Sequence, residues 1–263
     1  MLRKLLKYNL KDIYKGLIIF YSLSLFFAVL TRLFLGIENS FVMNIIGKIC
    51  SGTAIAMIFN IIINNLMRLW VRFRQNLYGD ESYLTHTLPI EKNILYLSKI
   101  LTSLITLFTS IVVIAITLFI AYYSKENIQL VKNLLMPLAE MYDSTVLTIL
   151  FAFIFVMFLE IMNILMSGYV GIVSGHRMNN NKMLYSIFFG FGIYLFTQIF
   201  AVLAIFICAI FNSDLMNLFY TMNALNIDII KLCIYMAIII YTISIFVLYF
   251  VNLKLFSKGV NVD

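Results

Sequence analysis

Long runs of residues with few or no charged side chains are the feature that most constrains this chain. Six of these runs are long enough to cross the roughly 30 Å hydrocarbon core of a bilayer, which takes about 20 helical residues. Lipid offers the backbone no hydrogen-bond partner, and such runs are too long for barrel strands. We therefore predict an all-α polytopic membrane protein whose six transmembrane helices lie near 16–35, 49–67, 100–123, 146–173, 183–211 and 232–253.

The composition excludes a water-soluble fold. Apolar side chains make up 63% of the chain and charged ones 12%, against roughly 45–50% and about 25% in soluble domains. The three cysteines are too few for a disulfide scaffold. Cys208 and Cys233 fall near the predicted outer ends of their spans, so a disulfide between them is a hypothesis that a non-reducing gel can test.

The distribution of basic residues predicts the topology. Of the 19 lysines and arginines, all but Arg32, Lys48, Lys125, Lys132 and Lys231 lie on the side that holds both termini. The positive-inside rule places that side in the cytoplasm. Because the basic residues border membrane spans and form no continuous patch, they do not indicate nucleic-acid binding.

Residues 1–15 form an amphipathic pattern before the first span. Lys4, Lys7, Lys11 and Lys15 recur at helical intervals on one face, with leucines on the other. We expect an interfacial amphipathic helix lying among the lipid headgroups. The alternative is a cytoplasmic extension of the first span with a solvated basic face.

Catalytic and metal-binding motifs are absent from the sequence. His86 and His176 are far apart and belong to no H-E-x-x-H pattern, and Gly47-Lys48, the one Gly-Lys pair, lacks the rest of a phosphate-binding loop. We therefore predict no catalytic residue, no metal site and no ATPase activity in this chain.

Two spans carry a stripe of small and polar residues. In 146–173 the stripe comprises Glu160, Asn163, Ser167 and Gly171, and in 49–67 it includes Asn60 and Asn64. Polar groups at membrane depth are costly unless they face protein or water. Both stripes are therefore predicted to point inward, either as helix–helix contacts, including a dimer face, or as part of a transport pathway.

The predicted cytoplasmic segment 68–99 contains a short displayed helix. Gly79-Asp80 is predicted to reverse the chain and cap the helix, with Glu81 in its first turn. Tyr83, Leu84, Thr87 and Leu88 follow, and Pro89 is expected to end this helix as the next begins. Its exposed tyrosine and leucine side chains are expected to bind in a groove of a partner protein.

This segment, LYGDESYLTHTLP, resembles the YGDEGYLxxTLP element of permease subunits in bacterial ABC transporters of the type-2 exporter class. The matching positions are Tyr78, Gly79, Asp80, Glu81, Tyr83, Leu84, Thr87, Leu88 and Pro89. Ser82 stands where glycine is usual, and Thr85-His86 stand where apolar residues are expected. The six spans and the long first cytoplasmic loop extend the resemblance to nearly the whole chain.

The resemblance implies a permease of the bacterial cytoplasmic membrane that forms the substrate pathway. Residues 79–89 would be a coupling helix that docks into a separate ATPase subunit, and that subunit would bind ATP and Mg²⁺. A second permease copy or a related permease chain would complete the pathway. It also implies that the outer loop 212–230 holds short re-entrant helices, with a plain surface helix as the alternative.

Two other functions remain open, a secondary ion-coupled transporter and a non-transporting scaffold or immunity protein. Secondary transporters often bind substrate at interrupted helices. Pro89 and Pro137 are both expected in loops, and Gly190-Phe191-Gly192 is the one candidate for a break within a span. Mostly continuous helices favour a transporter whose spans move as rigid bodies, driven by a separate subunit, over a secondary transporter.

Overall fold

The computed structural model describes residues 1–37, 40–87, 89–211, 216 and 227–258, and the regular structure of this part of the chain is helical throughout. Six of its helices are long and apolar enough to cross a membrane: α1 (Leu2–Leu35), α2 (Phe41–Leu77), α4 (Lys92–Tyr122), α6 (Val146–Gly175), α7 (Lys182–Phe211) and α9 (Ile227–Ser257). Each predicted span lies within one of these helices to within one residue. The prediction of an all-α polytopic membrane protein is therefore confirmed.

Two shorter helices connect the long ones. Helix α3 (Ser82–Thr87) lies between α2 and α4, and α5 (Lys125–Met141) lies between α4 and α6. Pro137 lies inside α5, so its expected position in a loop is wrong. The predicted re-entrant helices of 212–230 fall on residues that, with the exception of 216 and 227–230, lie outside the described part of the chain.

The amphipathic N-terminus and the first span form one continuous helix, α1, of 34 residues. At 1.5 Å per residue this helix is about 51 Å long, well beyond the thickness of the hydrocarbon core. Residues 2–15 are helical, as predicted, and continue into 16–35 without a break, since nothing in the sequence interrupts the helical hydrogen bonds near Gly16. The location of this stretch among the lipid headgroups stays a prediction.

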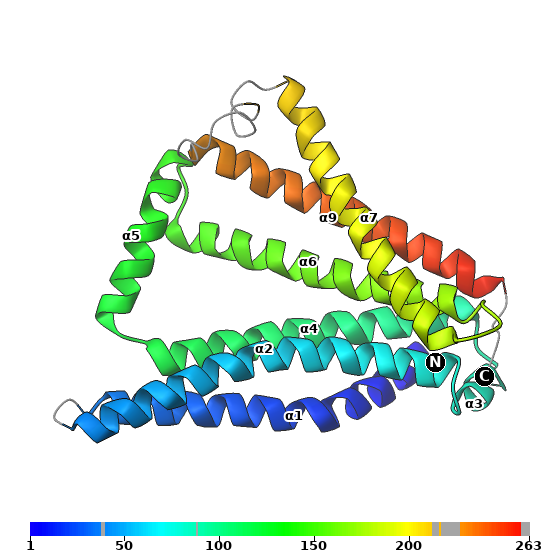
Figure 1. Ribbon diagram of the computed structural model, residues 1–263, viewed down its shortest axis with the longest axis horizontal. Helices are drawn as coiled ribbons and strands as arrows, with labels where there is room; N and C mark the ends of the chain where they lie inside the picture. Colours follow the sequence, from blue (N-terminus) through cyan, green and yellow to red (C-terminus); the bar gives the residue numbers. More distant parts are fainter. Residues whose placement is uncertain (38–39, 88, 212–215, 217–226, 259–263) are drawn as a thin grey trace. The chain divides into compact units, whose positions relative to one another are not determined.

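The chain divides into two compact units (Figure 1). The first contains Met1–Asn76 and Asp80–Gln129, and therefore α1 to α4 with the start of α5. The second contains Leu77–Gly79 and the chain from Leu130 onward, with α6, α7 and α9. The sequence predicted one six-helix domain from residue 16 onward and did not indicate this division.

Hydroxyl groups join α1 to α4 within the first unit. Tyr14 Oη lies 2.7 Å from Thr109 Oγ1, and Tyr21 Oη lies 2.7 Å from Ser110 Oγ. Small hydroxyl side chains allow two helix backbones to approach closely and also satisfy each other's polar groups in lipid. This polar contact, with the buried serines and threonines of α4 behind it, is what positions the ends of α1 and α4 next to α3.

In the second unit, α7 and α9 both pack against α6 (Figure 1). The start of α6 is fixed by Thr145, whose side-chain oxygen accepts a hydrogen bond from the Thr148 backbone N–H at 3.3 Å. Helix α7 runs through Gly190-Phe191-Gly192 without a break. Cys208 and Cys233 are free thiols in the structure.

Candidate functional site

Helix α3 displays two large apolar side chains on a short, well-anchored turn. Tyr83 is 77% exposed and Leu84 is 70% exposed, whereas Ser82 is buried. The helix begins one residue later than predicted, because Glu81 is its cap: the Thr85 backbone N–H donates to the Glu81 carbonyl oxygen at 3.1 Å. The exposed pair is therefore held on the outside of a rigid turn.

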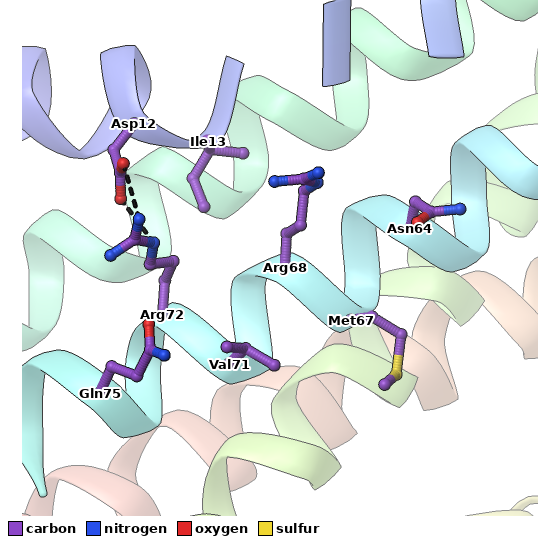
Figure 2. Close-up of a pocket in the computed structure, with 8 residues that line it drawn as sticks. All are labelled: Asp12, Ile13, Asn64, Met67, Arg68, Val71, Arg72 and Gln75. Carbon is purple, nitrogen blue, oxygen red and sulfur yellow. Dashed lines mark hydrogen bonds and ion pairs between the residues drawn. The ribbon is translucent and has the colours of Figure 1, made fainter. Parts of the chain in front are cut away.

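Glu81 fastens this turn to the long helices. Its carboxylate accepts a hydrogen bond from Arg72 Nη1 of α2 at 3.2 Å, and Asn76 Nδ2 also donates to it. Arg72 in turn pairs with Asp12 of α1, with Nε 2.6 Å from Oδ2 and Nη2 2.9 Å from Oδ1 (Figure 2). The ion-pair chain Asp12–Arg72–Glu81 thus links α1, α2 and the start of α3.

A second set of contacts extends this network to α4. Lys99 is buried, and its Nζ donates to Asn9 Oδ1 of α1 at 2.8 Å and to Asn76 Oδ1 of α2 at 2.5 Å. With two carboxylates and two cations, the network balances its charge internally. Each ion pair stays partly open to water and is worth at most about 1 kcal/mol. Because these contacts share residues, they hold the start of α3 in a fixed position relative to α1, α2 and α4, and they add little to the free energy of unfolding.

Tyr78, in the turn before α3, contacts His176 within the second unit. The two rings are tilted by 31° to each other with centroids 4.4 Å apart, and both side chains are buried. Burial raises the pKa of the Tyr78 hydroxyl, while Arg177 acts in the opposite direction. Three residues, Leu77–Gly79, therefore belong to one unit, while the chain on either side of them belongs to the other.

The predicted capping arrangement needs correction. Glu81 precedes α3 instead of lying in its first turn, and Asp80 is an exposed turn residue. Thr87 ends α3, with its hydroxyl donating to the Leu84 carbonyl oxygen at 3.0 Å. Pro89 is in a bend, and α4 begins only at Lys92 with Glu91 as its cap. Leu88 lies outside the described residues.

Glu160 has protein partners within the second unit. Its Oε1 accepts hydrogen bonds from Tyr194 Oη at 2.9 Å and from Gln198 Nε2 at 3.0 Å, both on α7. Tyr241 of α9 also interacts with this carboxylate. Neutral donors thus satisfy Oε1 of the single acidic group of α6, while its Oε2 is buried without a hydrogen-bond partner among the described residues.

The rest of the α6 stripe forms a close contact with α7. Asn163 Nδ2 donates to Thr197 Oγ1 at 3.0 Å, and Ser167 is buried. A side chain added at Gly171 would lie 2.4 Å from the backbone of Gly190. The stripe is covered by α7 of the same chain, as expected for a small-xxx-small helix contact.

The α2 stripe is arranged differently. Asn60 and Asn64 donate their side-chain amides to carbonyl oxygens one turn earlier on their own helix, at 3.1 and 3.0 Å. The buried amide is Asn65, whose Nδ2 donates to Ser110 Oγ of α4 at 2.8 Å. Asn65 lies 100° around the helix from Asn64 and was not part of the predicted stripe. The role of Asn60 and Asn64 in a pathway or dimer face stays a prediction.

Several residues of the network near α3 carried no signal in the sequence. Asn9, Asp12, Asn76 and Lys99 come from three helices and form no motif. Asp12 is the exception, because it is an acidic residue among the lysines at the start of α1 and could have been noticed for that reason.

Acidic, thiol and imidazole side chains do not gather into one cluster in the described part of the chain. No group of three or more His, Cys, Asp or Glu side chains lies close enough together there to hold a metal ion.

Comparison of the chain with profiles of known protein families, with curated proteins and with solved structures finds no match. The class that the fold defines is a multi-pass, all-α membrane protein.

Proposed function

We propose that this chain is the permease subunit of an ATP-driven exporter of the ABC type, and that α3 docks onto a separate ATPase subunit. The observation that carries the proposal is the exposure of Tyr83 and Leu84 on a helix of only six residues. Aromatic and aliphatic side chains displayed in this way are typical anchors at the centre of protein interfaces.

The anchoring of α3 supports a role in transmitting force. A docking helix that moves independently of the spans could not drive them. The chain Asp12–Arg72–Glu81 ties the start of α3 to α1 and α2, and Lys99 adds α4. Motion imposed on α3 would therefore reach three long helices at their predicted cytoplasmic ends.

The rest of the proposal follows from this assignment. The ATPase would supply the phosphate-binding loop that this sequence lacks. A second copy of the chain, or a related permease chain, would complete the pathway in the bacterial cytoplasmic membrane. Glu160, Tyr194 and Gln198 are the polar groups of the second unit that a pathway could use.

The experiment compares two pairs of exposed apolar residues. The variant Tyr83→Ala/Leu84→Ala removes the anchors of α3, and Leu130→Ala/Leu134→Ala removes two residues of α5 that are 60% and 75% exposed. Each tagged chain is expressed in its native host, solubilised in mild detergent and purified. We measure the amount of co-purifying chain that carries a GxxxxGK[ST] motif, together with ATP hydrolysis.

The proposal predicts loss of the ATPase chain and of hydrolysis for the α3 variant, with both retained for the α5 variant. Loss of one or two hot-spot residues typically weakens an interface by about 2 kcal/mol or more, which is roughly thirtyfold. Retention of the ATPase by the α3 variant would refute the docking role. Transport that depends on an ion gradient and not on ATP would favour a secondary transporter.

A further inference from the structure

A pocket of about 310 Å³ lies between α1 and α2 in the first unit. Its lining is mixed, with charged, amide and apolar side chains: Asp12, Ile13, Asn64, Met67, Arg68, Val71, Arg72 and Gln75. Figure 2 shows Arg68 extending from α2 toward α1, with no dashed line to another labelled residue. The pocket thus contains one arginine that is paired and one that is not.

The charge balance leaves Arg68 uncompensated. All three guanidinium nitrogens of Arg72 are used, two by Asp12 and one by Glu81. Among the residues that the structure describes, Arg68 has neither an ion pair nor a hydrogen bond, and its Nε is buried. A partly buried guanidinium that lacks an acceptor is costly, because it loses water without gaining a partner.

The geometry of α1 makes room for this guanidinium. The three terminal atoms of Arg68 occupy the space in which a Cβ at position 16 would lie, so a larger residue there has to push the guanidinium aside. Asn64, one turn from Arg68 on α2, places an amide at the pocket wall, while Gln75 lies at the other end of the lining, roughly 16 Å along the helix from Asn64. A free guanidinium with an amide one turn away suits the oxygen atoms of an anionic group.

The position along the helices indicates the source of that anion. Gly16 opens the apolar run of α1, and Met67 closes that of α2, so the pocket lies where both spans leave the hydrocarbon. Lipid phosphates lie at this level. Ile63 and Met67 lie one turn apart on the exposed surface of α2 and could contact an acyl chain above the headgroup.

We propose that this pocket binds the phosphate group of an anionic phospholipid, with Arg68 as its charged contact. Arg68 supplies the positive charge, and the Asn64 amide one turn away supplies a neutral donor. Free phosphate shares the chemistry of the headgroup but lacks the acyl chains that the apolar side of the site would hold. The lipid would occupy a site next to the Asp12–Arg72–Glu81 chain and so join α1 to α2.

The test uses the purified full-length chain in detergent. Binding of phosphatidylglycerol, phosphatidylcholine and inorganic phosphate is measured by native mass spectrometry and by competition with a fluorescent phosphatidylglycerol. The variants are Arg68→Gln, which removes the charge, and Gly16→Ala, which keeps every charge but displaces the guanidinium. Arg3→Gln is the matched control, since it removes one exposed positive charge from the same helix pair.

The proposal predicts preferential binding of phosphatidylglycerol that weakens about tenfold or more in Arg68→Gln. Gly16→Ala should weaken it about threefold, and Arg3→Gln less than about twofold. Arg68 has no protein partner to lose and its unpaired burial is costly, so its substitution should leave the melting temperature of the lipid-free chain unchanged or raise it. Equal losses in Arg68→Gln and Arg3→Gln would overturn the site, and displacement by millimolar phosphate as effective as by lipid would overturn the lipid assignment.

Discussion

Adding one methyl group at Gly171 tests the α6–α7 contact at its closest point. A Cβ there would lie 2.4 Å from both Cα and N of Gly190 and 2.6 Å from the Ser186 carbonyl oxygen. Ordinary contacts between carbon atoms are about 3.5–4.0 Å, so the two helices would have to separate by about 1 Å. All three neighbouring atoms belong to backbone, which has no rotamer with which to yield.

We expect Gly171→Ala to destabilise the protein by about 1–3 kcal/mol, the usual cost of overpacking. The same helix pair provides its own controls. A Cβ at Gly192 meets nothing within 4 Å, and one at Gly190 meets its nearest atom at 3.5 Å. Both alanine variants should therefore be neutral, or stabilised by a few tenths of a kcal/mol through helix propensity.

The assay is thermal unfolding of the purified chain in detergent, with all three variants measured in parallel. The reasoning predicts that Gly171→Ala melts several degrees below the parent chain, whereas Gly190→Ala and Gly192→Ala do not. If Gly171→Ala melted at the same temperature as Gly192→Ala, the close approach of α6 and α7 would be refuted.

Two further predictions concern polar groups of the second unit. Tyr78→Phe should be neutral or stabilising, because the buried Tyr78 hydroxyl has no hydrogen-bond partner in the described structure. Burial raises the pKa of this hydroxyl, so the parent chain should lose stability above about pH 10, where the tyrosine of the unfolded chain ionises. Melting curves at pH 8–11 should show a smaller loss of stability in the variant than in the parent chain. Glu160→Leu should still insert into the membrane but melt at a lower temperature, because Tyr194 and Gln198 lose their acceptor, whereas Glu160→Gln keeps an acceptor oxygen and should melt near the parent chain. A rise in stability with loss of transport in Glu160→Leu would instead favour a role in the pathway, and equal melting of both Glu160 variants would contradict the hydrogen-bond argument.

The spans were predictable from the sequence because length and apolarity are local properties that lipid enforces. The α6 stripe was predictable for a similar reason, since Ser167, Gly171 and Gly175 recur every four residues on one helix. The partners Ser186 and Gly190 were not, because they depend on how α7 packs. Local pattern identifies a contact face, and only the tertiary structure says what it contacts.

Two features of the polar and proline residues have a local explanation. Asn60 and Asn64 were predicted to face protein or water, and within this chain each amide donates one hydrogen bond to its own helix one turn away. Pro137 was expected in a loop between spans, yet it lies inside α5. Apolar residues of α5, including Leu130 and Leu134, recur at helical spacing and could have predicted this helix. Charged neighbours such as Lys125 and Glu126 made the segment look like a loop between spans.

The network next to α3 shows the limit of motif reading. The sequence singled out residues 79–89, and the exposure of Tyr83 and Leu84 agrees with a displayed helix. The contacts that fix this helix come from Asp12, Arg72 and Lys99, which are separated by up to 87 positions. Only the packing of α1, α2 and α4 brings these side chains together, so no local pattern could reveal them.

The central claim is that α3 is the docking point for a separate ATPase. Photocrosslinking from position 84 tests it most directly: a benzophenone amino acid replaces Leu84, and a matched chain carries it in place of the equally exposed Leu134 of α5. After irradiation of native membranes, our account predicts that the chain labelled at position 84 crosslinks to a protein with a GxxxxGK[ST] motif and that the chain labelled at position 134 does not. Crosslinks from position 84 to lipid alone, or to the same proteins as from position 134, would contradict the account.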